Sequence, residues 1–357
     1  MSIKIDPSLT MKIKPMIGLT GSPAAQSVWD SNFKFVSHMN DNPDTSHIKD
    51  STSNHNHGTK KGANEPVEVA GQVGKAQNFG GDDNVDCGDC CDMGVSDFTI
   101  ETLIKADSTQ ASNWPAIMDK GLPSGGYKFY IRETDGLLRL GLSTLYVSPT
   151  GGTDVTDDTS HYVVVRADRS GNAYFYVDGS QDGDAMDISE AVAINLDNAN
   201  PLMLGRRSDD ASDYYIGLQD EDRISDIART PGHIATTNKS LTDALITYSI
   251  SGTTITLTIA SGDVDEDLTD FPIYLNLSNS AGKGSTDLSS IFSTVGDNWQ
   301  RLKLVSASNV SCPMEVVSWD SSGSVAEVHG KVNLSSSSNT IYTLTFAPGA
   351  GRTKITP

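Results

Sequence analysis

The sequence of 357 residues is poor in basic residues and has no long apolar run. It has 26 Lys and Arg against 46 Asp and Glu, which gives a net charge of −20. Such a charge repels the phosphates of nucleic acids and anionic lipids, so we expect neither as a partner. No stretch approaches the roughly 18 consecutive apolar residues of a membrane helix, so we expect no membrane insertion. The first residues also lack the apolar core of a secretory signal, which favours synthesis in a cytoplasm.

Cysteine is also scarce, with four in the chain. Cys87, Cys90 and Cys91 resemble half of a zinc site, but no second Cys or His pair follows at the spacing that zinc needs. We therefore expect these three and Cys312 to be free, partly buried thiols. The Gly-x-Ser-x-Gly elbow, the His-Glu-x-x-His motif and the phosphate loop are missing as well. We expect a protein without enzymatic activity.

What the sequence does contain is a series of short strands, of which the clearest lie within residues 161–180. Tyr162–Val165 and Tyr174–Val177 are β-branched and aromatic runs, and the polar segment between them carries Gly171. This pattern predicts a β-hairpin. Both runs are apolar on both faces, which favours a central position in a layered sheet over an edge position.

Similar strand patterns recur along the chain with almost no helical periodicity. They predict an all-β protein made of an antiparallel sandwich and a second, smaller β-sandwich. We place the boundary at a polar break at residues 228–240, and residues 41–63 are predicted to be a solvent-exposed loop. The expected divisions are an N-terminal arm at 1–27, a first domain at 28–237, a second domain at 238–350 and a C-terminal tail at 351–357.

Five landmarks along the first domain resemble the laminin-G-like modules of the concanavalin A-like lectin/glucanase superfamily. They are Phe79–Asp83, Asp97–Glu101, Tyr174–Gly179, Leu204–Arg206 and Gly217–Ser225. The resemblance implies a jelly roll of two sheets. The chain departs from the family pattern at Thr102 and Leu103, where a Trp is frequent, and at Asp222, where an apolar residue is frequent.

Residues 240–347 resemble an uncharacterised β domain that accompanies laminin-G-like modules in bacterial surface proteins and tailed-phage structural proteins. The stretches that carry this resemblance are Asp267–Pro272, Glu315–Asp320 and Ile341–Leu344. The pairing implies a non-enzymatic protein of a tailed-phage virion, displayed on the capsid or tail. Its partners would be other virion subunits or copies of itself, and it could contact host surface glycans. The alternatives are a carbohydrate-binding adhesin module on a bacterial surface and a degenerate glycosidase.

Acidic residues in two places suggest a calcium site, because oxygen ligands from turns suit Ca²⁺ and the resemblance implies a calcium that pins loops. Asp82 and Asp83 lie in a Gly-rich turn, and Asp220 and Glu221 lie in the region of the last strand of the module. The alternative is that these are solvated acids. Asp220–Asp222 do not fit the catalytic pattern of the glucanases, because contiguous residues point to opposite faces of a strand.

A sugar site needs aromatic platforms beside polar side chains, on loops or on a sheet face. Aromatic residues at strand spacing are mostly core residues, so packing is the alternative for each candidate. The candidates for contact with glycan are Trp114, Tyr127, Tyr130, Arg206, Arg207, Tyr214 and Tyr215.

Overall fold

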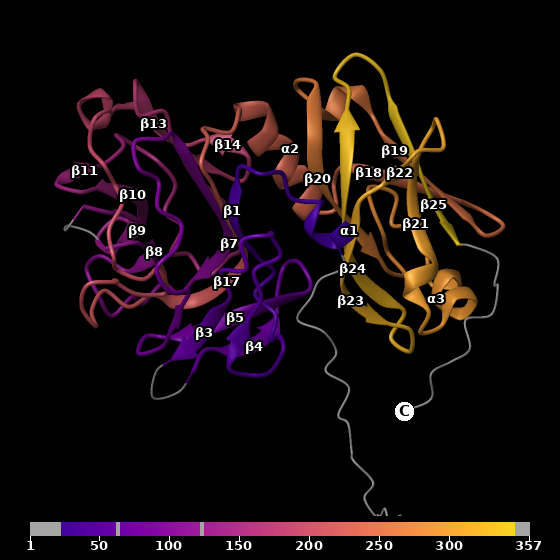
Figure 1. Ribbon diagram of the computed structural model, residues 1–357, viewed down its shortest axis with the longest axis horizontal. Helices are drawn as coiled ribbons and strands as arrows, with labels where there is room; N and C mark the ends of the chain where they lie inside the picture. The colour runs from indigo at the N-terminus through magenta and orange to yellow at the C-terminus, as the bar shows by residue number, and fades with distance from the viewer. Residues whose placement is uncertain (1–22, 62–64, 122–124, 347–357) are drawn as a thin grey trace, which may run out of the picture.

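The computed structural model describes residues 23–61, 65–121 and 125–346. Nearly all of its regular structure is β-strand, and the strands form two domains that lie side by side (Figure 1). The predicted all-β class is therefore confirmed. Residues 1–22 of the predicted arm and the predicted tail at 351–357 lie outside the described residues.

The first domain is a sandwich of two antiparallel sheets, as the laminin-G-like resemblance implies. The inner sheet, which lies nearer the second domain (Figure 1), contains in order β14 (Ser180–Gln181), β13 (Asn172–Val177), β12 (His161–Ala167), β7 (Phe98–Ala106), β17 (Ile216–Ser225), β5 (Lys75–Gly80) and β4 (Val67–Ala70), with β1 (Phe33–Ser37) paired to β17 and β15 (Met186–Asp187) paired to β13. The outer sheet contains in order β11 (Leu145–Val147), β10 (Leu137–Leu142), β9 (Tyr127–Arg132), β8 (Ala116–Asp119), β16 (Met203–Leu204), β6 (Asn84–Asp86), β3 (Gly58–Lys61) and β2 (His47–Ile48). A short 3₁₀ helix, η1 (Ser189–Ala191), follows β15.

The second domain pairs a larger sheet with a smaller one. The larger sheet contains in order β18 (Ile246–Ser251), β19 (Thr254–Ile259), β25 (Thr340–Phe346), β21 (Leu302–Ser306) and β22 (Ser311–Cys312), and the smaller sheet contains β20 (Leu268–Leu277), β24 (Val325–Leu334) and β23 (Met314–Asp320). The short helices are η2 (Ser261–Asp263), α3 (Ser290–Val295) and η3 (Trp299–Arg301). Leu257 and Leu344 of the larger sheet share a core with Leu275 and Val328 of the smaller one. The predicted second β-sandwich is confirmed as a fold.

The predicted hairpin of residues 161–180 is confirmed as the antiparallel pair β12–β13. Successive side chains of a strand point to opposite faces. In β12, Val163 and Val165 belong to the core between the two sheets, whereas Tyr162 and Val164 belong to an apolar cluster on the other face of the inner sheet. That second cluster includes Tyr274 of β20. The hairpin is apolar on both faces because the second domain covers the face that the outer sheet does not.

The predicted polar break at residues 228–240 is wrong in part, because it contains most of helix α2 (Pro231–Leu241). The side chain of Thr230 caps the helix by accepting a hydrogen bond from the backbone N–H of His233 (3.2 Å), and Pro231 occupies the first turn, where it removes no helical hydrogen bond. Ile234 of this helix joins the apolar cluster on the inner sheet. The polar composition concealed the helix, and the Thr-Pro pair was the available signal.

The predicted solvent-exposed loop at residues 41–63 is also wrong in part. It contains the edge strand β2 and the neighbouring strand β3, and Ile48, Asp50 and Ser51 are buried. The Asp50 carboxylate accepts hydrogen bonds from the backbone N–H groups of Val36 (3.1 Å) and Asn56 (2.9 Å). Some polar residues of this stretch, such as Asp50, therefore hold buried backbone, whereas others, such as His55, face water.

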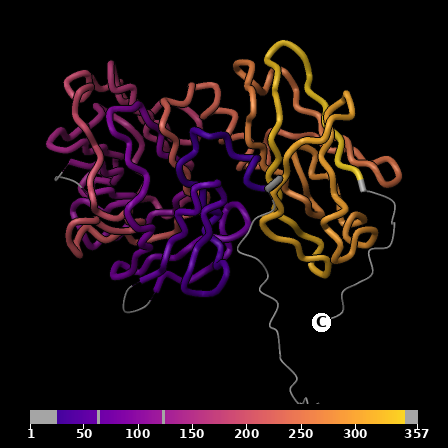
Figure 2. The backbone as a smooth tube through the Cα atoms, in the orientation of Figure 1, coloured from indigo at the N-terminus to yellow at the C-terminus, as the bar shows by residue number. Residues whose placement is uncertain are grey.

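Two segments near the boundary connect the domains. The first described helix, α1 (Pro23–Gln26), contacts β23, and α2 contacts β20. The backbone trace shows the indigo N-terminal segment between the two lobes (Figure 2). The N-terminal part of the chain thus contributes to the interface as well as to the first domain.

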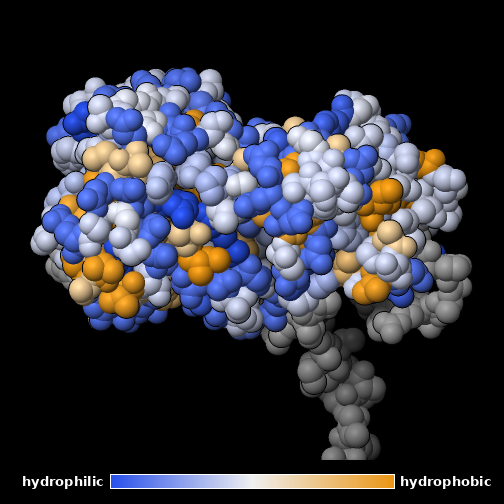
Figure 3. All heavy atoms as spheres, turned by 90° about the horizontal axis from the view of Figure 1, so that it is seen from above, coloured by the Kyte–Doolittle hydropathy of each residue, from blue (hydrophilic) through white to orange (hydrophobic). Residues whose placement is uncertain are grey.

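The surface is mainly polar. Figure 3 shows a face that is mainly hydrophilic, with its apolar side chains in small separate patches. The four cysteines are free thiols, as predicted, with Cys87 and Cys91 buried and Cys90 and Cys312 partly buried. Across the described ranges, no helix is both long and apolar enough to span a membrane.

Candidate functional site

A pocket of about 440 Å³ opens on the outer sheet. Strand β9 shows how the sequence builds it, because Tyr127, Phe129 and Ile131 point into the core while the residues between them point outward. The outward-pointing residues of β9 then meet side chains from β11 and from two loops. The residues that line the pocket are Trp114, Lys128, Tyr130, Arg132, Tyr146, Ser148, Arg207 and Asp213.

Aromatic rings and ion pairs are arranged together in this pocket. Trp114 meets Tyr130 edge to face, with ring centroids 6.0 Å apart. Lys128 Nζ lies 5.0 Å from the Tyr130 ring centroid and 2.6 Å from Asp213 Oδ2. Trp114 and Tyr146 are 44% and 56% exposed, so their rings are available to a ligand. The pocket thus combines accessible aromatic surface with charged groups fixed at its floor.

Burial changes the ionisation of two of these groups. It raises the pKa of Tyr130 to about 12, so its hydroxyl stays protonated at neutral pH. It also lowers the pKa of Lys128, an effect that the neighbouring Asp213 carboxylate opposes. Tyr130 can therefore donate a hydrogen bond, and the Lys128–Asp213 ion pair holds both charged side chains in place.

The structure brings together three of the predicted ligand residues and separates the others. Trp114, Tyr130 and Arg207 line the pocket just described. Tyr214 lines a neighbouring hollow of about 380 Å³, which shares Asp213 with the pocket. Arg206 lines neither of these two, and its guanidinium donates a hydrogen bond to the Asp210 carbonyl oxygen (2.9 Å).

The prediction of Tyr127 and Tyr215 as ligand residues is wrong, because both are fully buried. The Tyr127 hydroxyl donates to the Cys91 carbonyl oxygen (3.0 Å), and the Tyr215 hydroxyl donates to the Leu218 carbonyl oxygen (3.0 Å). Sequence reasoning also missed lining residues of the pocket. Alternation along β9 was the available signal for Lys128 and Arg132, whereas Tyr146 comes from a three-residue strand with no distinctive pattern.

The acids predicted as calcium ligands occupy two separate places. Asp82 and Asp83 lie in the turn after β5, beside the start of β17, where Gly80 pairs with Ile216. Burial and the neighbouring Asp82 carboxyl raise the pKa of Asp83 to about 6, and the backbone N–H of Gly80 donates to its carboxylate (2.8 Å). Ca²⁺ binding at this turn stays a prediction. Asp220 and Glu221 come later in β17 and do not join the turn.

Asp220 and Glu221 lie at a bulge of β17, on the side of the first domain that meets the second. Asp220 pairs with Leu103 and Arg223 with Glu101, so β17 has one more residue than β7 across this interval. Glu221 takes the extra position with φ of 53°, a conformation that a non-glycine residue adopts only when its surroundings hold it. The bulge turns the Glu221 side chain toward the second domain.

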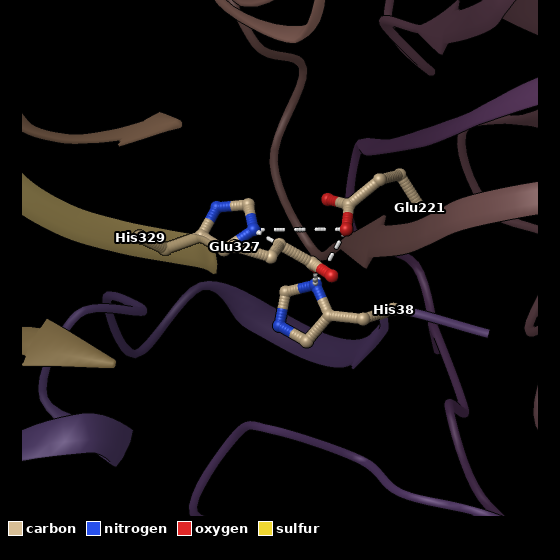
Figure 4. Close-up of side chains that lie close together, drawn as sticks. All are labelled: His38, Glu221, Glu327 and His329. Atoms are coloured by element: carbon tan, nitrogen blue, oxygen red, sulfur yellow. Dashed lines mark hydrogen bonds and ion pairs between the residues drawn. The ribbon is translucent and has the colours of Figure 1, made fainter. Parts of the chain in front are cut away.

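Glu221 forms part of a buried cluster with His38, Glu327 and His329, which we call the interdomain cluster (Figure 4). His38 follows β1, and Glu327 and His329 come from β24. His38 Nδ1 lies 2.5 Å from Glu221 Oε1. Although burial disfavours its charged form, the carboxylates of Glu221 and Glu315 raise the pKa of His38 to about 10. Sequence reasoning found only Glu221, because the others lie far from it along the chain and carry no local motif.

The acids that flank Glu221 are also buried. Asp220 accepts a hydrogen bond from the backbone N–H of Val73 (2.8 Å), and burial together with the Glu221 carboxylate raises its pKa well above the usual value. Burial raises the pKa of Asp222 to about 8, although a hydrogen bond from Thr102 opposes the shift. With exposures of 3% or less, the three contiguous acids present no carboxylate to a substrate.

Comparison with known proteins places the first domain in a family. Residues 79–235 match the model of the concanavalin A-like lectin/glucanases superfamily. The comparison with curated proteins found no match. This match agrees with the two-sheet sandwich and with the landmarks in the sequence.

Several solved structures share the general fold at low similarity. The chain is 19% identical to domain 4 of AbnA, an extracellular arabinanase from Geobacillus stearothermophilus, with a TM-score of 0.42 over 57% of this chain and 96% of that one. It is 13% identical to the binding domain of Paraclostridial mosquitocidal protein 1, with a TM-score of 0.47 over 83% of this chain and 66% of that one. It is 11% identical to the binding domain of botulinum neurotoxin serotype G, with a TM-score of 0.43 over 82% of this chain and 64% of that one. Similarities this low carry no information on ligand or activity. The family match and the two-sheet sandwich show that residues 79–235 form a laminin-G-like module of the concanavalin A-like lectin/glucanase superfamily.

Proposed function

We propose that this chain is a non-enzymatic structural protein of a tailed-phage particle, and that its first domain binds glycans on the host surface. The observation that carries the glycan-binding part is the pocket on the outer sheet. Its two exposed aromatic residues, Trp114 and Tyr146, stand beside fixed polar groups. This combination suits a sugar, which offers an apolar C–H face and a rim of hydroxyl groups.

The charged residues of the pocket favour ligand orientation over strong charge attraction. Lys128 is paired with Asp213, Arg132 with Asp135, and Arg207 with Asp209. Each cation therefore has an acidic partner, yet its remaining N–H groups can donate to hydroxyl oxygens. Fixed donors of this kind would set which sugar stereochemistry fits above the aromatic rings.

The composition of the pocket supports binding without hydrolysis. Most glycosidases use two carboxyl groups that flank the scissile bond. Among the residues that line the pocket, Asp213 is the one acid, and Lys128 holds its Oδ2 atom. A hydrolytic mechanism lacks its second carboxyl group there.

The virion part of the proposal rests on the resemblance of residues 240–347 to a β domain of tailed-phage structural proteins. Mass spectrometry of purified particles tests it, and the chain should be present at a fixed number of copies per particle. Its absence from particles, together with display on the bacterial surface, would establish the adhesin alternative instead.

Replacing Trp114 with alanine should weaken glycan binding at least tenfold, which corresponds to about 1.4 kcal/mol of binding free energy. The change removes a large, exposed stacking surface and leaves the core intact. A glycan array with the full chain identifies a ligand, and isothermal titration calorimetry with that ligand then compares the variant with the unchanged protein.

Two matched variants locate the site. Trp114→Phe keeps an aromatic face and should retain most of the affinity. Tyr214→Ala changes the neighbouring hollow and should leave the affinity within about twofold, since it removes no ring from the pocket. Equal affinity of Trp114→Ala and the unchanged protein would rule out this pocket, and an array without any bound glycan would contradict the proposed activity.

A further inference from the structure

The interdomain cluster has the composition and geometry of a metal site. His38, Glu221, Glu327 and His329 each offer one ligand atom, and these four atoms lie within 4.8 Å of one another. The close-up shows the side chains converging on one point from both domains (Figure 4). Two come from the first domain and two from β24 of the second.

The nitrogen-to-oxygen distances between ligand atoms can be compared with those of a tetrahedral site. With bonds of about 2.0–2.1 Å, the ligand atoms of a tetrahedral zinc lie about 3.3 Å apart. His38 Nδ1 to Glu327 Oε1 is 3.6 Å, His329 Nε2 to Glu221 Oε1 is 3.7 Å, and His329 Nε2 to Glu327 Oε1 is 3.6 Å. His38 Nδ1 and Glu221 Oε1 are only 2.5 Å apart, so these two atoms must move apart by less than 1 Å to bind a metal ion together.

Two of the four side chains have unpartnered polar atoms. In the described part of the chain, neither ring nitrogen of His329 and neither carboxylate oxygen of Glu327 has a hydrogen-bond partner. His329 is fully buried and Glu327 is 2% exposed. Polar groups buried in this way cost free energy unless something binds them. A protonated His38 would satisfy Glu221, but it would leave the polar atoms of His329 and Glu327 without partners.

Neighbouring residues contact the His38 and Glu221 side chains through the atoms that do not face the cluster. Arg223 Nη2 lies 2.5 Å from Glu221 Oε2, which leaves Oε1 for the cluster. Glu315 Oε2 lies 3.6 Å from His38 Nε2, on the ring edge opposite Nδ1. A carboxylate behind a ligating imidazole is the usual second layer of a metal site. Three carboxylates, from Glu221, Glu315 and Glu327, face two cations, Arg223 and Lys49, so the group carries net negative charge, which favours a bound cation.

We propose that His38, Glu221, Glu327 and His329 bind one divalent transition-metal ion of the zinc class, which joins the two domains. Two imidazoles and two carboxylates suit such ions, whereas Ca²⁺ and Mg²⁺ prefer oxygen ligands alone. Four protein ligands complete a tetrahedral shell, and all four are buried. Such a closed site is structural and leaves no position for a substrate. This site is independent of the glycan pocket.

Metal analysis of the full chain tests the proposal. Protein produced with added Zn²⁺ should carry about one zinc per chain by mass spectrometry of the metal. Compared with protein from metal-depleted medium, its melting temperature should be at least about 3 °C higher. Ca²⁺ and Mg²⁺ at the same concentration should leave the melting temperature unchanged. Protein produced with Co²⁺ should show the visible absorption of a tetrahedral cobalt site.

Two conservative variants identify the ligands. Glu327→Gln and His329→Gln keep the approximate size of the side chain and should lose the bound zinc and its stabilisation. His161→Gln is the matched control, because His161 also pairs with carboxylates of Asp157 and Asp178 but lies outside the cluster. If a ligand variant fails to fold, the zinc content and the cobalt spectrum of the unchanged protein still show whether the cluster binds a metal ion. Unchanged protein without bound zinc and without a tetrahedral cobalt spectrum would overturn the proposal.

Discussion

Replacing Glu315 with alanine should lower the free energy of unfolding by about 3–5 kcal/mol, because it breaks a buried ion pair and leaves its partners unpaired. Glu315 belongs to β23 of the second domain, yet it accepts hydrogen bonds from three donors of the first. These donors are Trp29 Nε1 (2.9 Å), Lys49 Nζ (2.8 Å) and Ser51 Oγ (2.8 Å). The side chain is almost fully buried, so water cannot replace the lost acceptor.

Differential scanning calorimetry measures this effect. The unchanged protein should unfold in a single cooperative transition, because Trp29 and Glu315 connect the two domains through a buried hydrogen bond. In Glu315→Ala, the second domain should separate from the first and melt at a lower temperature.

Two further variants separate the causes. Glu315→Gln keeps one acceptor oxygen, enough for either Trp29 or Ser51, which donate to different oxygens, and it loses the charge opposite Lys49, so its destabilisation should be intermediate. Glu133→Ala removes an exposed acid and should change stability by no more than about 0.5 kcal/mol. If Glu315→Ala melts at the same temperature as the unchanged protein, this contact does not hold the domains together.

Local patterns in the sequence were enough to predict the strands and the fold class. The hairpin β12–β13 follows from two short apolar runs and a glycine between them, and its apolar residues on both faces already indicated a second covering layer. Alternation also separates Tyr127, which packs in the core, from Tyr130, which lines the pocket. Each of these inferences needs only neighbouring residues.

The interdomain cluster could not be predicted, because its parts are distant in the chain and each looks ordinary alone. His38 stands near the end of a short stretch with the alternation of a strand, and Glu327 and His329 alternate along one strand as solvated residues often do. Their burial depends on how the second domain docks, which no local pattern encodes. Ser51 was mistaken for a loop residue for the same reason, since a polar residue that pairs across an interface resembles one that faces water.

Helix α2 provides a second test of the interface, through the pH dependence of stability. His233 is buried in this helix and packs edge to face against Phe271 of β20, with ring centroids 5.1 Å apart. Burial, followed by the positive charges of Arg229 and Arg223, lowers the pKa of His233 to about 3, although the Asp30 carboxylate opposes the shift. The histidine is therefore neutral in the folded protein over most of the acidic range.

The sign of the effect follows from proton binding. Below pH 6.5 the unfolded chain binds a proton at His233, whereas the folded protein does not until about pH 3. Stability should therefore fall as the pH decreases through this window. The contribution of this residue approaches about 1.4 kcal/mol per pH unit. His233→Leu keeps the approximate volume of the side chain and cannot ionise. The free energy of unfolding of this variant should therefore depend less steeply on pH, by the contribution of His233.

Urea unfolding of the unchanged protein and His233→Leu at pH 6 and pH 4 measures the difference. The loss of stability between these two pH values should be about 2 kcal/mol smaller in the variant. His55→Leu, on an exposed loop, is the control for removing a histidine and should retain the slope of the unchanged protein. Parallel pH profiles for the unchanged protein and His233→Leu would mean that His233 gains its proton in the folded state. The contact between α2 and β20 would then admit a charge, and the two domains would be less closely packed there than the burial of His233 requires.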